Sequence, residues 1–409
     1  MKILLATYWV VPHLGGVWNY MGQLKRKLES LGHEVDLLGY GENNNYIHLV
    51  NEDRKINRDQ LLPLVYANLT KQPLPANHAD ALVKYCDISR HVYELGVSYL
   101  GLEKYDIIHT QDVYSTACIN RIRGKETPLV ATLHGCVAHE MKHHIINNMN
   151  QTSTSAMACS YFEDLEHEGS TSAEITIVAN NWLKRILTDE FHAPSKQIQV
   201  FHYGYDTKAF LERIAETESH VQRPNDKAVI LYTGRLVELK GVHHLISALG
   251  QLKKLRNDWI CWVVGEGEDQ DMFRAQSKAL ELENDIIFLG RRNDIPYLLS
   301  ESDIFVFPSL IENQPLSVIE AQITGKPVIV SDTGGLPEMV QHGVTGLIYP
   351  KGDIEKLSNN INLLLQHKVY RETLGNNAKK WGMNHWSLDQ GVKNVVKVYE
   401  QAIFKRKNI

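Results

Sequence analysis

Two glutamates, Glu312 and Glu320, stand eight positions apart in the stretch ENQPLSVIEAQITGKPV, residues 312–328. Pro315 suits the first turn of a helix, because the N–H that proline lacks would have no helical partner there. The apolar residues that follow recur at helical spacing, which predicts a loop at Glu312 and a helix that carries Glu320 near its start. A carboxylate at either place can accept hydrogen bonds from sugar hydroxyls, and Glu320 could take the vicinal hydroxyls of a ribose.

The start of the same predicted helix also offers backbone donors. The N–H groups of Gln314, Leu316 and Ser317 would point at an anionic or oxygen-rich part of a ligand. An acid near a helix N-terminus is, taken singly, more often explained by the helix dipole alone. Both interpretations of the two glutamates stay open from the residues themselves.

A pair of cations lies in GRLVELKG, residues 234–241, directly after an apolar run. Arg235 can bind an anion as a planar fork and Lys240 as a compact charge, so the two could converge on a diphosphate. Two exposed loop cations are the simpler explanation of any isolated R-x4-K. The flanking glycines and the position after a buried strand favour a binding role here.

Other candidate positions also follow predicted strands. His134, between PLVATL and a glycine, could hydrogen-bond near the reacting carbon of a sugar, and Gly16 ends a glycine pair after KILLATYWVVP. SDTGGLPEMV, residues 331–340, could line the same site or only close a tight turn. Ligands of open parallel sheets bind outside the carboxyl ends of the strands, which is where these residues are predicted.

Three patterns suggest other chemistry and are set aside. The G-x-G at residues 265–267 has Gln270 where a dinucleotide fingerprint needs a third glycine, which disfavours a nicotinamide enzyme. Asp269-x-Asp271 opens a predicted helix, where acids are ordinary. The histidines within residues 139–144 lack the H-E-x-x-H order, and the five cysteines form no C-x-x-C pair. We expect no catalytic metal and no cofactor.

The elements that must position these residues alternate between strands and helices. Six short apolar runs in the first half of the chain (KILLA, EVDLLG, DIIHT, LVATLH, ITIVA, IQVFHYG) and six in the second (AVILYTG, WICWVVG, DIIFLG, IFVFP, PVIVS, GLIYP) are separated by helical patterns. Such alternation predicts parallel sheets covered on both faces. A polar connector at 213–227 divides the series, so the fold class is α/β with two doubly wound domains.

Composition limits the class of protein. The 409 residues are 43% hydrophobic and 22% charged, as in a globular protein too long for one ordinary core. A formal net charge of −5 argues against nucleic acid as a partner, because duplex binding needs a concentrated basic face. The N-terminal apolar run reads as a buried strand and not as a signal peptide. We expect a cytoplasmic protein, with peripheral contact to a membrane left open.

These boundaries follow from the pattern: an N-terminal domain at 1–205, a C-terminal domain at 206–385, and a terminal segment at 386–409 that is predicted as a long amphipathic helix. Residues 43–104 break the alternation and are expected to be a helical insertion in the first domain.

Taken together, the motifs resemble the retaining glycosyltransferases of family 4, also called glycosyl transferases group 1. The resemblance covers essentially the whole chain: P-x-x-G-G, LESLGHEV, GRLVELKG, the E-x7-E element, GKPVIVSDTGGLPEMV and GVTGLIYP. It implies the GT-B fold, in which two Rossmann-like domains face a central cleft. The second domain would hold a nucleotide-sugar donor, the first an acceptor, and the terminal helix would cross back to the first domain.

The resemblance also implies roles for single residues. Arg235 and Lys240 would bind the donor diphosphate, Glu320 the ribose, and Glu312 the transferred sugar. The same likeness would place Gly16 against the phosphate or sugar, His134 near the 6-position of the sugar, and the backbone of Arg291 at the base.

The function expected from this likeness is the metal-independent transfer, with retention, of a hexose or N-acetylhexosamine from a nucleoside diphosphate sugar. UDP is the expected nucleotide, and the acceptor could be a glycan, a lipid-linked molecule or a small molecule. A non-catalytic module that only binds nucleotide sugars is the alternative. The sequence departs from the family at Pro315, where many members have glycine, and at His202-Tyr203, where Pro-Asn is common.

Overall fold

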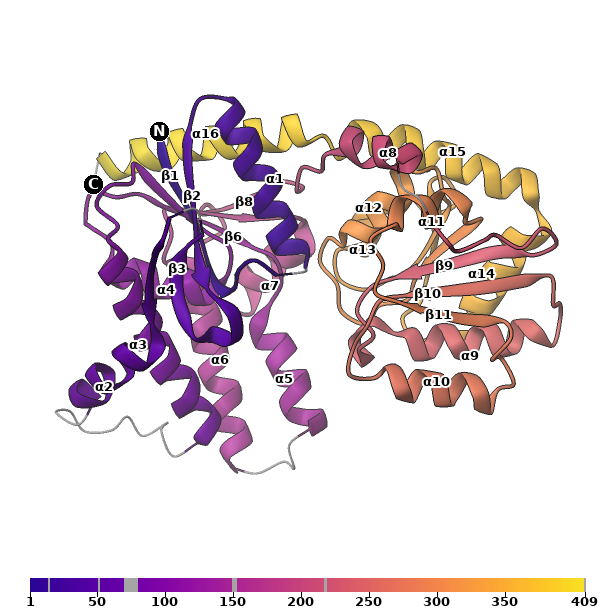
Figure 1. Cartoon of the computed structure of the whole chain (residues 1–409), viewed down its shortest axis with the longest axis horizontal. Helices are drawn as coiled ribbons and strands as arrows, with labels where there is room; N and C mark the ends of the chain where they lie inside the picture. The colour runs from indigo at the N-terminus through magenta and orange to yellow at the C-terminus, as the bar shows by residue number, and fades with distance from the viewer. Residues whose placement is uncertain (14, 51, 70–79, 149–152, 217–218, 408–409) are drawn as a thin grey trace. The chain divides into compact units, whose positions relative to one another are not determined.

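The computed structural model describes residues 1–13, 15–50, 52–69, 80–148, 153–216 and 219–407 (Figure 1). It divides into two compact units, each of which is described by itself below. Unit 1 comprises Met1–His202 and Asp389–Ile409, and unit 2 comprises Tyr203–Leu388. The chain therefore passes between the units after His202 and after Leu388, a few residues from the boundaries expected at 205 and 385.

Unit 1 is built on a sheet of eight strands within the described residues, in the order β4-β3-β2-β1-β5-β6-β7-β8. The central strands pair in parallel, and β5, β6 and β7 are buried along their whole length, as expected for a sheet covered on both faces. The strands are β1 (Lys2–Val10), β2 (Glu34–Tyr40), β3 (Tyr46–Leu49), β4 (Arg54–Asn57), β5 (Ile107–Thr110), β6 (Leu129–Leu133), β7 (Ile175–Val178) and β8 (Ile198–Val200).

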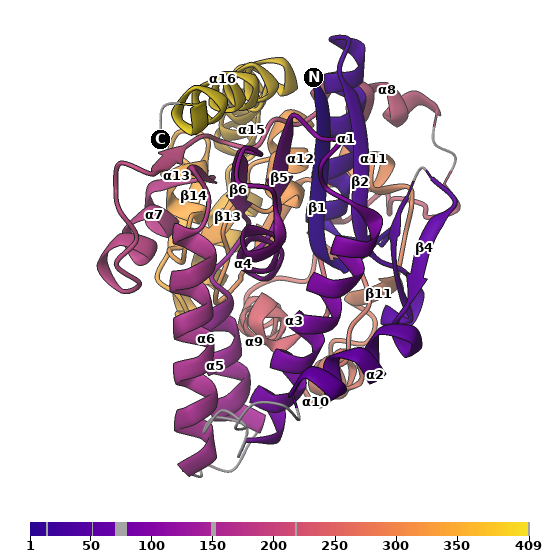
Figure 2. The same ribbon diagram turned by 90° about the vertical axis from the view of Figure 1, so that its left-hand side faces the viewer.

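Helices lie on both sides of this sheet. In Figure 1, α1 and α16 lie on one side, and α3, α4 and α6 pack together on the other. Figure 2 shows α5 and α6 side by side as a helix pair, in agreement with their contacts. The helices are α1 (Gly16–Ser30), the 3-10 turn η1 (Glu42–Asn44), α2 (Arg58–Leu69), α3 (Ala81–Leu100), α4 (Val113–Ile122), α5 (Val137–Asn148), α6 (Ser153–Thr171), α7 (Asn181–Asp189) and α16 (Leu388–Lys407).

The prediction of a helical insertion at 43–104 is wrong in part. Helices α2 and α3 are present, but β3 and β4 form an antiparallel extension of the sheet next to β2. The buried residues Ile47, Leu49 and Ile56 alternate with polar ones over only four positions in each strand, too short a stretch for the period to stand out. Within this insertion, residues 51 and 70–79 lie outside the described part of the chain.

The terminal helix α16 belongs to unit 1 from Asp389 onward. Lys27 in α1 pairs with Asp389 at 2.5 Å, and the ring of His109 at the end of β5 hydrogen-bonds to the hydroxyl of Tyr399 at 2.8 Å. Both contacts fix α16 against its own unit. Among the described residues, no helix is both long and apolar enough to cross a bilayer.

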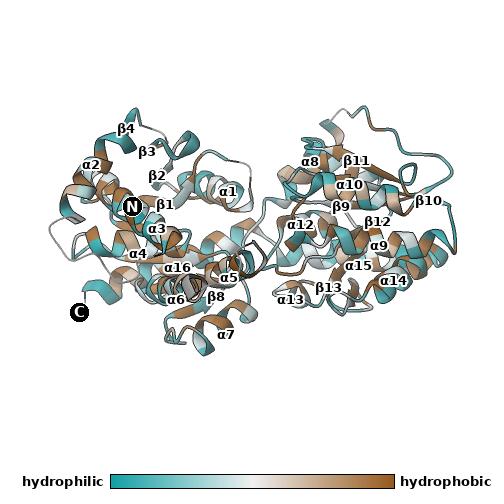
Figure 3. Ribbon diagram, turned by 90° about the horizontal axis from the view of Figure 1, so that it is seen from below, coloured by the Kyte–Doolittle hydropathy of each residue, from teal (hydrophilic) through white to brown (hydrophobic). Residues whose placement is uncertain are grey.

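Unit 2 has a six-stranded parallel sheet in the order β11-β10-β9-β12-β13-β14. The hydrophobic colour of Figure 3 follows these strands, which supply much of the core of this unit. The strands are β9 (Ala228–Thr233), β10 (Trp259–Val264), β11 (Ile286–Gly290), β12 (Ile304–Phe307), β13 (Val328–Ser331) and β14 (Gly346–Tyr349).

The helices of unit 2 also cover two faces. Helices α9 and α10 pack on one side of the sheet, and α8, α11 and α12 pack on the other (Figure 1). The helices are α8 (Thr207–Glu216), the 3-10 turn η3 (Glu238–Lys240), α9 (Val242–Lys253), α10 (Gln270–Ala279), α11 (Ile295–Glu301), α12 (Leu316–Ile323), α13 (Leu336–Met339), α14 (Ile354–Gln366) and α15 (Lys368–His385).

Each of the twelve apolar runs predicted as strands is present as a strand, and each sheet reverses its strand order once. In unit 1 the reversal lies between β1 and β5, and in unit 2 it lies between β9 and β12. The loops that follow neighbouring strands at a reversal diverge to opposite faces, which is where open α/β sheets bind ligands. The two reversals therefore identify the regions in which functional side chains should be sought.

Candidate active site

The loops after β9 and β12 are joined to each other in unit 2. The N–H of Leu310 donates to the carbonyl of Leu239 at 2.8 Å, and the hydroxyl of Ser309 donates to the same carbonyl at 3.0 Å. Gly241 makes this approach possible: its φ is +70°, and a Cβ there would lie 1.9 Å from the carbonyl oxygen of Pro308. The two predicted binding loops are therefore one structure.

This contact brings Lys240 and Glu312 together. Lys240 Nζ lies 2.5 Å from Glu312 Oε2, and the two side chains are only 16% and 14% exposed. The ammonium also lies 5.9 Å from the centre of the Phe307 ring. The ammonium group has three donors, so it can bind a second anion while it keeps Glu312.

Arg235 lies at the end of β9 on the same loop and is exposed. Its carbonyl accepts a hydrogen bond from the hydroxyl of Tyr232 at 2.9 Å, which holds the backbone at this position. The guanidinium forms no ion pair with any of the described residues. Lys240 is thus compensated by Glu312, whereas the charge of Arg235 faces solvent. An anion bound here would be held first by Arg235.

Glycine-rich turns support these loops. Gly334 has φ +60°, and a Cβ on it would lie 1.8 Å from the carbonyl oxygen of Glu312, while Gly335 donates its N–H to that oxygen at 3.0 Å. The turn within residues 331–340 therefore packs against the Glu312 loop, and its role in lining the site stays a prediction. Gly265 and Gly267 similarly approach the backbone of residues 234–236, so the G-x-G motif serves backbone packing in this fold.

Helix α12 begins at Leu316, and the residue before it, Pro315, makes no side-chain cap to its first N–H groups. The N–H of Leu316 and that of Ser317 fall in the first turn, where a helix supplies no acceptor. Gln314 is buried, and its amide bonds to the backbone of Tyr203 at 3.3 and 3.5 Å. Because that amide is already used, Gln314 can offer a ligand mainly its backbone.

Glu320 accepts a hydrogen bond from the hydroxyl of Tyr205 through Oε1 at 2.6 Å. Protein atoms surround the carboxyl, although the residue keeps part of its surface accessible. Burial raises the pKa of Glu320 to about 7, while the Tyr205 hydrogen bond and the charge of Arg213 act in the opposite direction. Tyr205 was not predicted as a site residue, and no local sequence pattern points to it.

Two predicted site residues belong to unit 1. His134 follows β6, and its Nε2–H donates to Gln111 Oε1 at 3.0 Å, while its ring meets that of Tyr20 edge to face at 5.2 Å. Burial lowers the pKa of His134 to about 3, which leaves the imidazole neutral near pH 7. Gly16 is the first residue of α1 after β1, so both residues lie at carboxyl ends of strands.

Arg291 stands apart from the joined loops of unit 2. It follows β11, the edge strand, and its side chain is exposed. Strands β10 and β9 separate β11 from β12, so Arg291 is placed at the same end of the sheet but at its edge.

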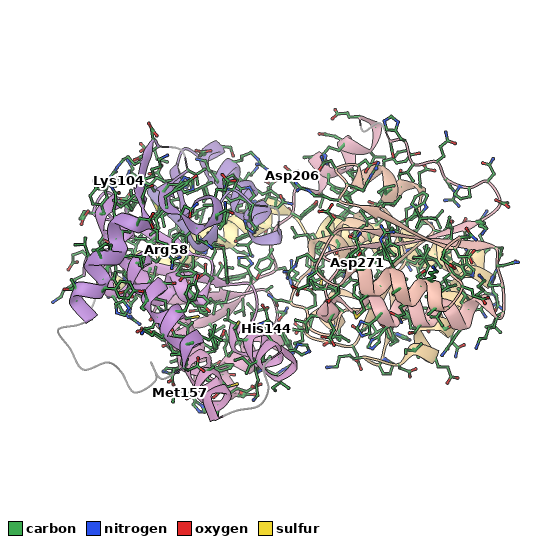
Figure 4. All side chains as sticks on the ribbon, turned by 60° about the horizontal axis from the view of Figure 1, so that its bottom comes forward. Arg58, Lys104, His144, Met157, Asp206 and Asp271 are labelled. Atoms are coloured by element: carbon green, nitrogen blue, oxygen red, sulfur yellow. The ribbon has the colours of Figure 1, made fainter. Side chains whose placement is uncertain are left out.

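Two of the residues set aside as metal ligands, Asp269 and His139, have other partners. Asp269 Oδ2 accepts the N–H of Glu238 at 2.6 Å and Asp271 lies in the first turn of α10 (Figure 4). His139 Nε2 bonds to Glu190 at 2.8 Å. Among the residues described, no three His, Cys, Asp or Glu side chains gather as a metal site would require.

Comparisons with known proteins cover both units. Residues 14–209 match the family described as Glycosyltransferase Family 4, and residues 214–381 match Glycosyl transferases group 1. An uncharacterized glycosyltransferase of Methanocaldococcus jannaschii is 26% identical, covering 98% of this chain and 99% of its own. The UDP-Gal:alpha-D-GlcNAc-diphosphoundecaprenol alpha-1,3-galactosyltransferase of Escherichia coli is 28% identical, covering 75% and 78%. The structure of HepE from Anabaena in complex with UDP-glucose has a TM-score of 0.67 and 21% identity, covering 98% and 100%.

Proposed function

Because this chain belongs to glycosyltransferase family 4, the glycosyl transferases group 1, and is a glycosyltransferase of the GT-B fold, we propose that its donor is a UDP-sugar. It moves a hexose or N-acetylhexosamine to an acceptor hydroxyl with retention of the anomeric configuration. The E. coli relative is named for a UDP-galactose donor, and the HepE structure holds UDP-glucose. Both support uridine as the base.

One observation supports the donor site above the others: the Lys240–Glu312 pair next to the exposed Arg235 at the strand reversal of unit 2. The leaving group of the reaction is a diphosphate, so the site must stabilise growing negative charge. Arg235 and Lys240 supply that stabilisation as prearranged donors, which is usually the largest contribution to catalysis of this kind. Glu312, held by Lys240, is placed to accept hydroxyls of the transferred sugar.

The rest of the donor lies along α12 in this proposal. The first-turn N–H groups of Leu316 and Ser317, which have no backbone acceptor among the described residues, face the oxygen-rich part of the donor together with that of Gln314. Glu320 accepts from the ribose hydroxyls. The backbone at Arg291 meets the base. In unit 1, Gly16 approaches the phosphate or sugar, His134 donates or accepts near the 6-position, and this unit holds most of the acceptor.

The transfer step proceeds on one face of the sugar. The bond from the anomeric carbon to the diphosphate oxygen breaks while the acceptor oxygen forms its bond on the same side. The acceptor proton passes to a diphosphate oxygen, so neither glutamate is required as a general base. This differs from glycoside hydrolysis, where two carboxylates share those tasks.

Donor turnover tests the proposal. The wild-type protein is incubated with UDP-glucose, UDP-galactose and UDP-N-acetylglucosamine, and the release of UDP is measured without an acceptor. We expect slow hydrolysis of at least one donor and a strong reduction in Glu312→Gln. The matched control is Glu355→Gln, an exposed acid on α14 of the same unit. Stabilisation by UDP without turnover of any donor would instead support a module that only binds.

A further inference from the structure

The segment Tyr203–Tyr205 contacts both ends of the E-x7-E element in unit 2. The N–H of Tyr203 donates to Gln314 Oε1 at 3.3 Å, and its hydroxyl accepts from Asn313 Nδ2 at 3.2 Å. Two residues further on, the hydroxyl of Tyr205 donates to Glu320 at 2.6 Å. Tyr203, which lies where the sequence departs from its family, therefore contacts the proposed donor-binding element directly.

Tyr205 is itself firmly held. The residue is 4% exposed, and its ring packs on that of Phe210 with the centroids 5.8 Å apart. Its N–H donates to the carbonyl of Trp386 at 2.9 Å, and the indole N–H of Trp386 donates to Gln322 on α12 at 2.8 Å. The hydroxyl that meets Glu320 thus comes from a rigid support that is also tied to the same helix.

A rigid partner matters because a free glutamate side chain samples many rotamers. Fixing a free glutamate side chain when the ligand binds costs up to about 2 kcal/mol of conformational free energy. A carboxylate that is already ordered in the folded protein does not incur this cost on binding. Tyr205 takes Oε1, and no hydrogen bond to Oε2 is found among the described residues, which leaves Oε2 for a ligand. A single short hydrogen bond therefore decides where the second oxygen points.

We propose that Tyr205 is a positioning residue for nucleotide recognition, which orients Glu320 so that the carboxylate binds the ribose hydroxyls of the donor. This role rests on the proposed function, because Glu320 meets a ribose only if the site of unit 2 holds a nucleoside diphosphate. It makes ribose recognition depend on a hydroxyl that never touches the donor.

The test compares ligands with and without the 2′-hydroxyl of the ribose. Calorimetry gives the affinities of UDP and 2′-deoxy-UDP for the wild type and for Tyr205→Phe, Glu320→Gln and the double variant. Tyr349→Phe is the matched control, because the Tyr349 hydroxyl is buried in the same unit without a hydrogen-bond partner among the described residues. Inorganic pyrophosphate is a second probe, since it has no ribose and reports whether the diphosphate site is intact.

We expect the wild type to prefer UDP over 2′-deoxy-UDP by about tenfold or more, the usual size for a hydrogen bond to a charged group. Glu320→Gln should lose most of that preference, and Tyr205→Phe should reduce it at least threefold while pyrophosphate affinity stays constant. The double variant should lose no more than Glu320→Gln alone, because both changes act on one contact.

Three results would overturn the role of Tyr205. The first is a lower thermal stability of Tyr205→Phe with the ribose preference unchanged, which would make the bond structural only. The second is additive loss in the double variant. The third is a wild type that binds pyrophosphate but neither nucleotide. That result would also rule out the proposed donor, whereas the first two results would leave the donor in place and rule out only the role of Tyr205.

Discussion

Glu166 on α6 offers a quantitative test of how the structure treats a buried acid. The residue is 0% exposed, and its Oε2 accepts the N–H of Ala138 at 3.0 Å in the first turn of α5. Its Oε1 has no hydrogen-bond partner among the described residues. Burial raises the pKa of Glu166 to about 8, and the charge of Glu140 adds to the effect. We therefore predict that Glu166→Gln gains stability relative to the wild type as the pH rises.

The sign and size follow from the pKa. Because the folded protein binds this proton more tightly than the unfolded chain, the stabilisation is complete at low pH and is lost as the pH rises from the ordinary value of 4.5 through about 8. The whole window corresponds to about 5 kcal/mol, since each pKa unit is worth about 1.4 kcal/mol. Between about pH 6 and about pH 8 the loss amounts to about 2 kcal/mol. Glutamine cannot ionise, so the variant should not show this loss.

The assay is denaturant unfolding of wild type and Glu166→Gln at about pH 6 and about pH 8. Glu163→Gln is the control, because Glu163 lies on the same helix but is exposed. The stability of Glu166→Gln relative to wild type should improve by about 2 kcal/mol from the lower to the higher pH, and that of the control should stay within about 0.5 kcal/mol. An equal difference at both pH values would refute the assignment of a buried, protonated acid.

Three other changes have defined outcomes. Arg235→Ala should weaken UDP binding by about tenfold or more in calorimetry, because a charge-assisted hydrogen bond is lost. The control is Arg274→Ala, since Arg274 is an exposed arginine on α10, and this variant should bind UDP as the wild type does. Equal affinities of Arg235→Ala and the wild type would remove Arg235 from the site. Gly241→Ala should lower the free energy of unfolding in denaturant far more than Gly290→Ala does. Both glycines have positive φ, but only a Cβ at Gly241 would meet backbone atoms. Similar losses of stability in the two variants would contradict the tight contact of the two loops. His134→Gln should lower kcat without moving the acidic limb of its pH profile, because the pKa of His134 is already about 3; a shifted limb would show that His134 titrates in the working range.

Much of the fold could be predicted from the sequence because buried parallel strands are continuous apolar runs. β12 and β13, for example, are buried at every residue and stand out as IFVFP and PVIVS. β3 and β4 escaped prediction because their few buried residues, two in β3 and one in β4, stand next to polar ones and form no continuous apolar run. The polar residues within β3 and β4, and not their length, limited the prediction, because the equally short β12 and β13 are continuous apolar runs and were predicted.

The candidate site was predictable where a residue carries its own local signal. Lys240 and Glu312 follow strands that are neighbours in the sheet but not in the sequence. Each is a charged residue directly after an apolar run, so each loop could be recognised by itself, and the structure brings the two side chains into contact. Tyr205 lacks such a signal, because its importance comes from a hydrogen bond to a residue 115 positions away. Contacts of that range depend on the packing of α12 against the connecting segment, which no local pattern describes.

The most direct test of the donor site is a crystal structure of the protein with UDP bound. We expect the diphosphate oxygens to lie within hydrogen-bond distance, about 3 Å, of the Arg235 guanidinium and Lys240 Nζ, and a ribose hydroxyl to donate to Glu320. A nucleotide bound away from the loops after β9 and β12, with Arg235 and Lys240 free of phosphate, would contradict it.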